Sequence, residues 1–77
     1  MLEQIEEVFR KVFDNPKLTI SENTSAKDIK MWDSISHIEL ISELEAHFKL
    51  CFTFDEVMGF KQVGDIIRTI NKRQTKY

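Results

Sequence analysis

Hydrophobic residues recur at helical spacing in three stretches of the chain. In residues 2–14, 34–48 and 62–73 they return every three or four positions. This spacing places apolar side chains on one face of an amphipathic helix. The predicted core positions are Leu2, Ile5, Val8, Phe9, Val12, Phe13, Ile38, Leu40, Ile41, Leu44, Phe48, Val63, Ile66, Ile67 and Ile70. We therefore predict three substantial helices that share one core.

The starts and ends of these helices are marked with unequal clarity. Asn15-Pro16 ends the first helix, because the residue before a proline disfavours the helical conformation. Asp33 is a good N-cap for the second helix and places Ser34 at its first position. Ser36 and Glu39 form a competing capping box, so the start of this helix is open by two or three residues.

Two connections and a short helix complete the predicted fold. Residues 15–32 hold hydrophobic residues without a sustained period, which predicts a long loop pinned to the core, with a turn at Ser25–Asp28. Residues 49–53 are interpreted as an apolar connection, because a lone strand would have no partner. Thr53-Phe54-Asp55-Glu56 matches a capping box and opens a short helix that ends near Gly59.

The last predicted helix begins without a good N-cap. Its Gly64 costs about 1 kcal/mol relative to alanine in a helix. We therefore expect tertiary packing to stabilise this helix.

Length and composition favour a small helical domain. The 77 residues include only 2 Gly and 1 Pro, and a second core would not fit in this length. We predict an all-α, four-helix bundle with three longer helices, one short helix and a long first loop, as one domain over residues 1–77. No apolar run reaches the length of a membrane span, and the single Cys51 excludes an internal disulfide. We expect a soluble, cytoplasmic monomer.

The net charge of −2 is unevenly distributed. Residues 28–56 carry seven acids against two bases, whereas residues 60–77 carry five bases, Lys76 among them, against Asp65. The acidic middle repels phosphate backbones and so disfavours nucleic-acid binding. The basic end is interpreted as favourable charge at a helix C-terminus, with DNA binding through this end as a third reading.

Catalytic and metal-binding interpretations of the polar residues are weak. Ser34 and His37 lie three residues apart on one helix, but a hydrolytic serine also needs an orienting acid, an oxyanion hole and a pocket. We interpret His37, which falls inside the apolar arc, as a partly buried packing residue. His37 and His47 are about 15 Å apart along a helix and cannot share one ion. We predict no catalytic residue and no metal site.

Ser34 is also a candidate modification site. At a helix start its hydroxyl points outward, and the free backbone N–H groups and the helix dipole there favour a phosphate group. Glu39 and Glu43 should face water one turn apart, as an acidic stripe that a basic partner enzyme would bind. The residues alone leave a simpler reading open, in which Ser34 only caps a helix of a small interaction module.

The second helix carries a recognisable pattern. The segment Asp33-Ser34-Ile35-Ser36-His37-Ile38-Glu39-Leu40-Ile41, followed by Leu44-Glu45 and Phe48, resembles the signature of acyl carrier proteins. The first helix, the long loop, the short helix and the last helix also fit this family. The resemblance covers nearly the whole chain.

The resemblance implies a specific chemistry. Ser34 would receive 4′-phosphopantetheine from coenzyme A, transferred by a separate, magnesium-dependent phosphopantetheinyl transferase (a holo-carrier synthase). The thiol of this arm would carry acyl groups as thioesters between acyl-loading and acyl-transfer enzymes, and the carrier itself would not be an enzyme. By analogy, Ile35, Glu39 and Glu43 would lie on the helix that partner enzymes recognise. Asp33 would help the transferase engage.

The segment before Ser34 departs from many fatty-acid carriers. Lys30-Met31-Trp32 stands where those carriers have Leu-Gly-x, and the net charge is less acidic than theirs. An aromatic residue at this place resembles carriers of polyketide, peptide-synthetase or surface-polysaccharide pathways. We therefore expect a dedicated biosynthetic pathway rather than primary fatty-acid synthesis.

Overall fold

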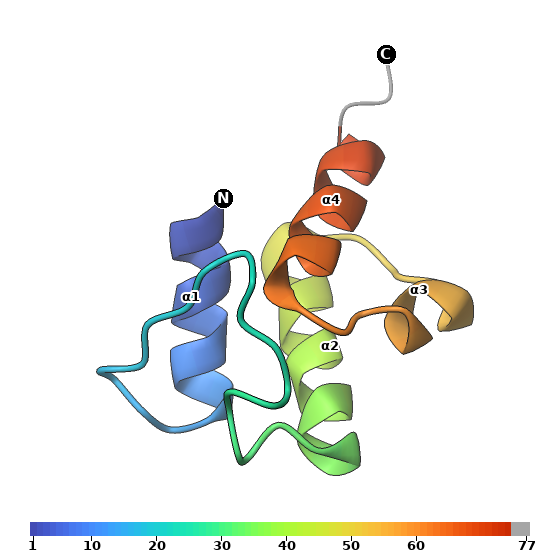
Figure 1. The fold of residues 1–77 in the computed structure, drawn as a ribbon. Helices are drawn as coiled ribbons and strands as arrows, with labels where there is room; N and C mark the ends of the chain where they lie inside the picture. Colours follow the sequence, from blue (N-terminus) through green and yellow to red (C-terminus); the bar gives the residue numbers. More distant parts are fainter. Residues whose placement is uncertain (75–77) are drawn as a thin grey trace.

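Four helices form within residues 1–74, which are the residues that the computed structural model describes (Figure 1). Their bounds are α1 Leu2–Val12, α2 Ser34–Phe48, α3 Phe54–Met58 and α4 Val63–Gln74. The predicted all-α fold, with three longer helices and one short helix, is confirmed. Lys76 of the predicted basic end lies outside the described residues. Within residues 1–74 no helix is long and apolar enough to cross a membrane.

The arrangement of the helices leaves α3 at one side of the bundle. α1 packs against α2, and the loop between them crosses this pair before it enters α2 (Figure 1). α3 lies on the side of the molecule away from α1 (Figure 1). The five-residue α3 buries none of its own residues. Val57 is only partly buried and packs against the core, so the place of α3 depends on this one apolar side chain and on polar bonds.

α1 ends two residues earlier than the sequence predicts. Phe13 is its C-cap, and Asp14 turns the chain into the left-handed region with φ of 50°. The N–H of Asn15 still donates to the carbonyl of Arg10 at 3.0 Å. An aspartate tolerates this conformation better than most residues, so the chain leaves the helix before it reaches Pro16.

The core lies between α1, α2 and α4 and includes residues of the long loop. Its members are Ile5, Val8, Phe9, Ile20, Ile29, Trp32, Leu40, Ile41, Leu44, Phe60, Val63, Ile66 and Ile70. Ile20, Ile29 and Trp32 confirm that the loop is pinned to the core. The prediction for Ile38 is wrong, because its side chain is 67% exposed. Ile38 lies about 160° around the helix axis from the fully buried Leu40.

The long loop also forms the start of α4. The N–H groups of Val63 and Gly64 donate to the carbonyls of Thr24 and Glu22, both at 2.8 Å. The Asp65 carboxylate accepts from the N–H groups of Lys61 and Gln62. The first two N–H donors of α4 are therefore satisfied by a distant loop, and Asp65 holds the two residues that precede the helix, which explains how α4 begins without a local N-cap residue.

The turn predicted at Ser25–Asp28 is present. The N–H of Asp28 donates to the carbonyl of Ser25 at 2.9 Å. Ser25 also forms an isolated antiparallel bridge with Gln62, just before α4. This bridge holds the turn against the start of the last helix.

The connection into α3 and its caps agree with the sequence prediction. Thr53 and Glu56 form a reciprocal capping box, and Gly59 is the C-cap. Arg73 of α4 binds the Glu56 carboxylate and donates to the carbonyl of Cys51 at 2.9 Å. The hydrogen bonds from Thr53 and Arg73 lower the pKa of Glu56. These contacts tie α3 to the end of α4.

Candidate functional site

Asp33 places Ser34 at the first position of α2. Its carboxylate accepts hydrogen bonds from the N–H groups of Ile35 and Ser36, both at 3.0 Å. The hydroxyl of Ser36 accepts from the N–H of Asp33 at 2.8 Å, which completes a capping box. The predicted N-cap is confirmed. The competing box at Ser36 and Glu39 is wrong, because Ser36 is itself the third helical residue of the box that Asp33 begins.

The same hydrogen bonds keep Asp33 charged. The N–H of Ser36 is the largest cause that lowers the pKa of Asp33, and the N–H of Ile35 adds to it. The Ser36 hydroxyl also donates to the carbonyl of Met31 at 2.6 Å, which fixes the chain on the other side of Asp33. At neutral pH a negative charge therefore lies directly beside Ser34.

Ser34 itself is exposed at this helix start. Within residues 1–74 its hydroxyl has no hydrogen-bond partner. We expected free N–H groups at this helix start, but those of Ile35 and Ser36 donate to the Asp33 carboxylate. These two donors are therefore not free to bind a phosphate group on Ser34.

His37 is bonded at both ring nitrogens. Its Nδ1 accepts from the indole Nε1–H of Trp32 at 2.9 Å, and its Nε2 lies 3.0 Å from the carbonyl oxygen of Val57 in α3. The Trp32 and His37 rings are stacked, with centroids 6.1 Å apart. His37 is half-buried, as predicted. Neither nitrogen is available to Ser34, so the described structure contains no serine–histidine dyad.

Large apolar side chains are exposed near the start of α2 and on α3. We call this set the apolar rim: Met31, Ile35, Ile38, Phe54 and Met58, each 62–76% exposed. The first three lie at or just before the start of α2, and the other two lie on α3. Of these five residues, only Ile35 was expected, from the family resemblance, to take part in partner recognition. Phe54 inside the capping box of α3 and Met58 at the end of this short helix were a signal for the other half.

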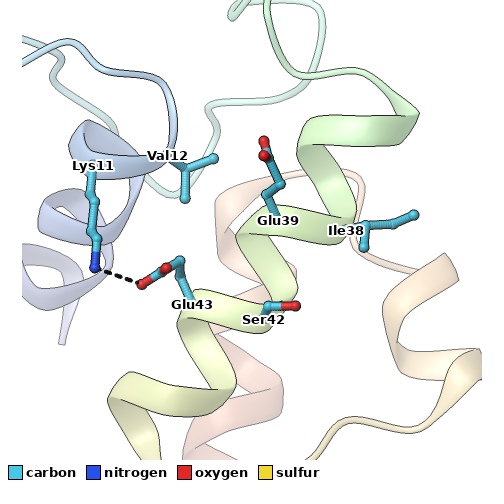
Figure 2. Close-up of a pocket in the computed structure, with 6 residues that line it drawn as sticks. All are labelled: Lys11, Val12, Ile38, Glu39, Ser42 and Glu43. Carbon is cyan, nitrogen blue, oxygen red and sulfur yellow. Dashed lines mark ion pairs between the residues drawn. The ribbon is translucent and has the colours of Figure 1, made fainter.

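The two glutamates of the predicted acidic stripe have different surroundings. Glu39 is exposed, as predicted. Glu43 points toward α1 (Figure 2), is half-buried and forms an ion pair with Lys11, with Nζ and Oε1 3.1 Å apart. The prediction of two freely solvated acids is therefore wrong for Glu43, because α1 supplies a counter-charge.

An open groove of about 350 Å³ separates these parts of α1 and α2. Lys11 and Val12 form its α1 side, and the α2 side consists of Ile38, Glu39, Ser42 and Glu43. In Figure 2, Ile38 points away from α1 and toward α3. The exposed side of α2 therefore has an apolar edge toward α3 and an acidic edge toward α1.

The described residues contain no group of three or more His, Cys, Asp or Glu side chains that could hold a metal ion. His37 is bonded to Trp32 and Val57. His47, at the far end of α2, packs against the ring of Phe48. Neither histidine therefore belongs to a cluster of metal-binding side chains within the described residues.

Comparison with known proteins adds a family to this geometry. The sequence profile of the phosphopantetheine attachment site matches residues 3–70. The solution structure of a holo acyl carrier protein from Geobacter metallireducens is similar, with 40% identity and a TM-score of 0.87 over 95% of this chain and 84% of that one. A putative acyl carrier protein from Mycobacterium tuberculosis has 26% identity and a TM-score of 0.81 over 91% and 93% of the two chains. No curated protein matches.

Proposed function

The chain belongs to the phosphopantetheine attachment family as an acyl carrier protein, and we propose that Ser34 is the residue to which its 4′-phosphopantetheine is attached. A carrier of this family is not an enzyme, and the bound arm supplies a thiol that forms thioesters with acyl groups. The residues around Ser34 suit this role, since the hydroxyl is exposed and free of hydrogen bonds within residues 1–74. This free hydroxyl at the first position of α2 is the observation that carries the proposal.

The contacts of Ser34 do not support the alternative role, in which this serine only caps a helix. If the chain were a small interaction module, Ser34 would be present as a helix cap. Asp33 and Ser36 perform the capping, and Ser34 contributes no side-chain bond to it. An exposed serine with no structural task, in a helix start built by its neighbours, is what an attachment point requires.

We infer that partner enzymes bind the surface that surrounds Ser34. These partners are a phosphopantetheinyl transferase and enzymes that load and transfer acyl groups. Asp33, Ile35 and Glu39 are exposed on this surface. Glu43 stays part of it, with its charge already paired by Lys11. Recognition therefore combines apolar contact with one free acid on α2 instead of two.

We further propose that the carrier serves a dedicated pathway of the polyketide, peptide or surface-polysaccharide type. The support is the segment Lys30-Met31-Trp32. Trp32 is buried, with its ring 5.2 Å from that of Phe9 in an edge-on contact, so this aromatic residue is part of the framework that presents Ser34. We propose that the carrier works as one cytoplasmic, monomeric domain over residues 1–77.

The attachment site is tested by incubating the purified protein with coenzyme A, magnesium and a broad-specificity phosphopantetheinyl transferase. Intact mass spectrometry should show the mass of one phosphopantetheine arm on the wild type and on Ser42→Ala, whose serine is also exposed on α2. Ser34→Ala should show no gain. A wild type left unmodified by a transferase that loads a control carrier, or a Ser34→Ala variant that is still modified, would overturn the assignment.

A further inference from the structure

The residues of the apolar rim come from two helices that are separate in the sequence. Met31, Ile35 and Ile38 belong to the start of α2, whereas Phe54 and Met58 belong to α3. α3 has five residues and fully buries none of them, and only Val57 packs against the core. The two halves form one surface only if α3 is held at a defined place beside the first turns of α2.

A hydrogen bond from His37 joins α3 to these turns. The ring Nε2 of His37 lies 3.0 Å from the carbonyl oxygen of Val57, which is central in α3. The Arg73–Glu56 contact instead ties α3 to the end of α4. The bond to Val57 is therefore positioned to set the distance between the two halves of the apolar rim.

The hydrogen bond between Trp32 and Nδ1 of His37 determines which ring nitrogen of His37 carries the proton. The indole Nε1–H of Trp32 can only donate, so Nδ1 of His37 must be unprotonated to accept at 2.9 Å. A neutral imidazole then carries its proton on Nε2, where it donates to the carbonyl of Val57. Trp32 is itself anchored in the core against Phe9. The buried Trp32 therefore fixes the orientation of the His37 imidazole.

We propose that His37 is a positioning residue for partner binding. By bonding Trp32 on one side and Val57 on the other, it holds α3 against the start of α2, so that the two halves of the apolar rim meet a partner enzyme as one surface around Ser34. This inference rests on the proposed function of Ser34. Both ring nitrogens of His37 are bonded to Trp32 and Val57 and neither to the hydroxyl of Ser34, so in this proposal His37 acts only through the place of α3.

Three variants separate this role from general stability. His37→Phe keeps a ring and removes both hydrogen bonds. His37→Gln keeps an N–H donor that can reach the carbonyl of Val57 but loses the fixed imidazole. His47→Phe is the matched control, because His47 is exposed at the far end of α2.

The first measurement uses the apo protein and amide hydrogen exchange by NMR. The N–H groups of Val57 and Gly59 donate to the carbonyls of Thr53 and Asp55 within and at the end of α3. In His37→Phe their exchange should become about fivefold faster, the effect of one lost hydrogen bond, while amides of α1 keep their rates. His37→Gln should fall between this variant and the wild type, and His47→Phe should match the wild type.

The second measurement is the steady-state kinetics of the phosphopantetheinyl transferase. For His37→Phe the KM for the carrier should rise about fivefold with kcat within about twofold of the wild type, because the surface is disturbed and the hydroxyl is not. Equal KM values, or exchange at Val57 and Gly59 that matches the wild type, would overturn the proposal.

The outcomes distinguish this inference from the attachment site. If the wild type does not receive phosphopantetheine, the assignment of Ser34 is wrong. The amide exchange rates of the apo protein would still show whether His37 holds α3 in place. If His37→Phe fails to fold, the KM of the transferase is measured for His37→Gln and Trp32→Phe instead. In the folded wild type, nitrogen chemical shifts of the His37 ring should report a proton on Nε2, and a proton on Nδ1 would contradict the proposal.

Discussion

Lys11 of α1 and Glu43 of α2 form an ion pair across the groove between their helices, with Nζ and Oε1 3.1 Å apart. Because of this ion pair, two glutamates that lie one turn apart on the same helix have different surroundings. Glu39 keeps its charge free toward solvent, and Glu43 shares its charge with α1. The two acids should therefore contribute differently to partner binding and to stability.

Reversing the charge of Glu39 should weaken partner binding without unfolding the protein. For Glu39→Lys we expect kcat/KM of the transferase to fall about threefold to tenfold, because a free acid near Ser34 guides a basic enzyme surface. Glu43→Gln should change kcat/KM little and should lower the free energy of unfolding by about 0.2–1 kcal/mol, as for other exposed ion pairs. Transferase kinetics and urea denaturation check both variants. A larger kinetic effect for Glu43 than for Glu39 would contradict this reading.

Polar substitution within the apolar rim should also weaken partner binding. Ile35→Ser and Ile38→Ser replace side chains that are 74% and 67% exposed, so the free energy of unfolding should change by no more than about 0.5 kcal/mol. The KM of the transferase should rise, and the rise should persist at high salt because apolar contact is not screened. Ala46→Ser, an exposed position farther along α2, is the control. Unchanged KM values for both isoleucine variants would exclude the rim from the interface.

Removing the cap of α2 should destabilise the helix that carries Ser34. Asp33→Ala leaves the N–H groups of Ile35 and Ser36 without their acceptor, so its melting temperature should be lower than that of the wild type. Asp33→Asn keeps a side-chain oxygen and should lose less. Circular dichroism melts of both variants test this order. A melting temperature of Asp33→Ala at or above that of Asp33→Asn would contradict it.

Stability should fall in acid through three carboxylates. Hydrogen bonds lower the pKa of Asp33 and of Glu56, and for Asp65 they outweigh burial, which raises the pKa. A carboxyl group with a lower pKa in the folded state stabilises the fold above its unfolded pKa, and this contribution is lost as pH falls through the folded value. The loss should begin near the ordinary values of 4.5 for Glu56 and 3.8 for the aspartates and continue below them. Melting temperatures from pH 7 downward should fall less steeply for Asp33→Asn than for the wild type.

Gly64→Ala should destabilise the protein although alanine favours helices. A Cβ at Gly64 would lie 3.1 Å from the carbonyl oxygen of Glu22, and that oxygen accepts the Gly64 N–H at 2.8 Å. The loop must therefore move and lengthen the bond that starts α4. We expect a net loss of about 1–3 kcal/mol in the free energy of unfolding, as for other overpacked sites. Urea denaturation measures it, and a gain in stability would show that the loop yields freely.

Local features of the sequence were sufficient to predict the helices and most of their ends. The capping box of Thr53 and the N-cap Asp33 act within three residues, so both were visible in the order of the amino acids, although the box that Asp33 forms with Ser36 was not predicted. The spacing of apolar residues likewise identified the core faces of α1, α2 and α4. The resemblance to acyl carrier proteins, carried by the segment that begins at Asp33, pointed to the family that the comparisons then showed.

The periodic pattern failed where the direction of a helix face depends on its neighbours. Ile38 has the spacing of a core residue, yet α1 and α4 pack against the side of α2 that holds Leu40 and Leu44, which leaves Ile38 exposed. An apolar arc shows that a residue can be buried, and the neighbouring helices determine whether it is.

The sequence by itself determined which segments are helical and offered Asp33 as the cap of α2, because the groups involved lie within a few residues of one another. The structure then chose Asp33 over the competing box at Ser36 and Glu39 and so placed Ser34 first in the helix. Only the tertiary structure decided that Glu43 is paired with Lys11, that Glu22 completes the start of α4 and that His37 reaches Val57. These partners are far apart in the chain, and no local pattern records which distant groups packing will bring together.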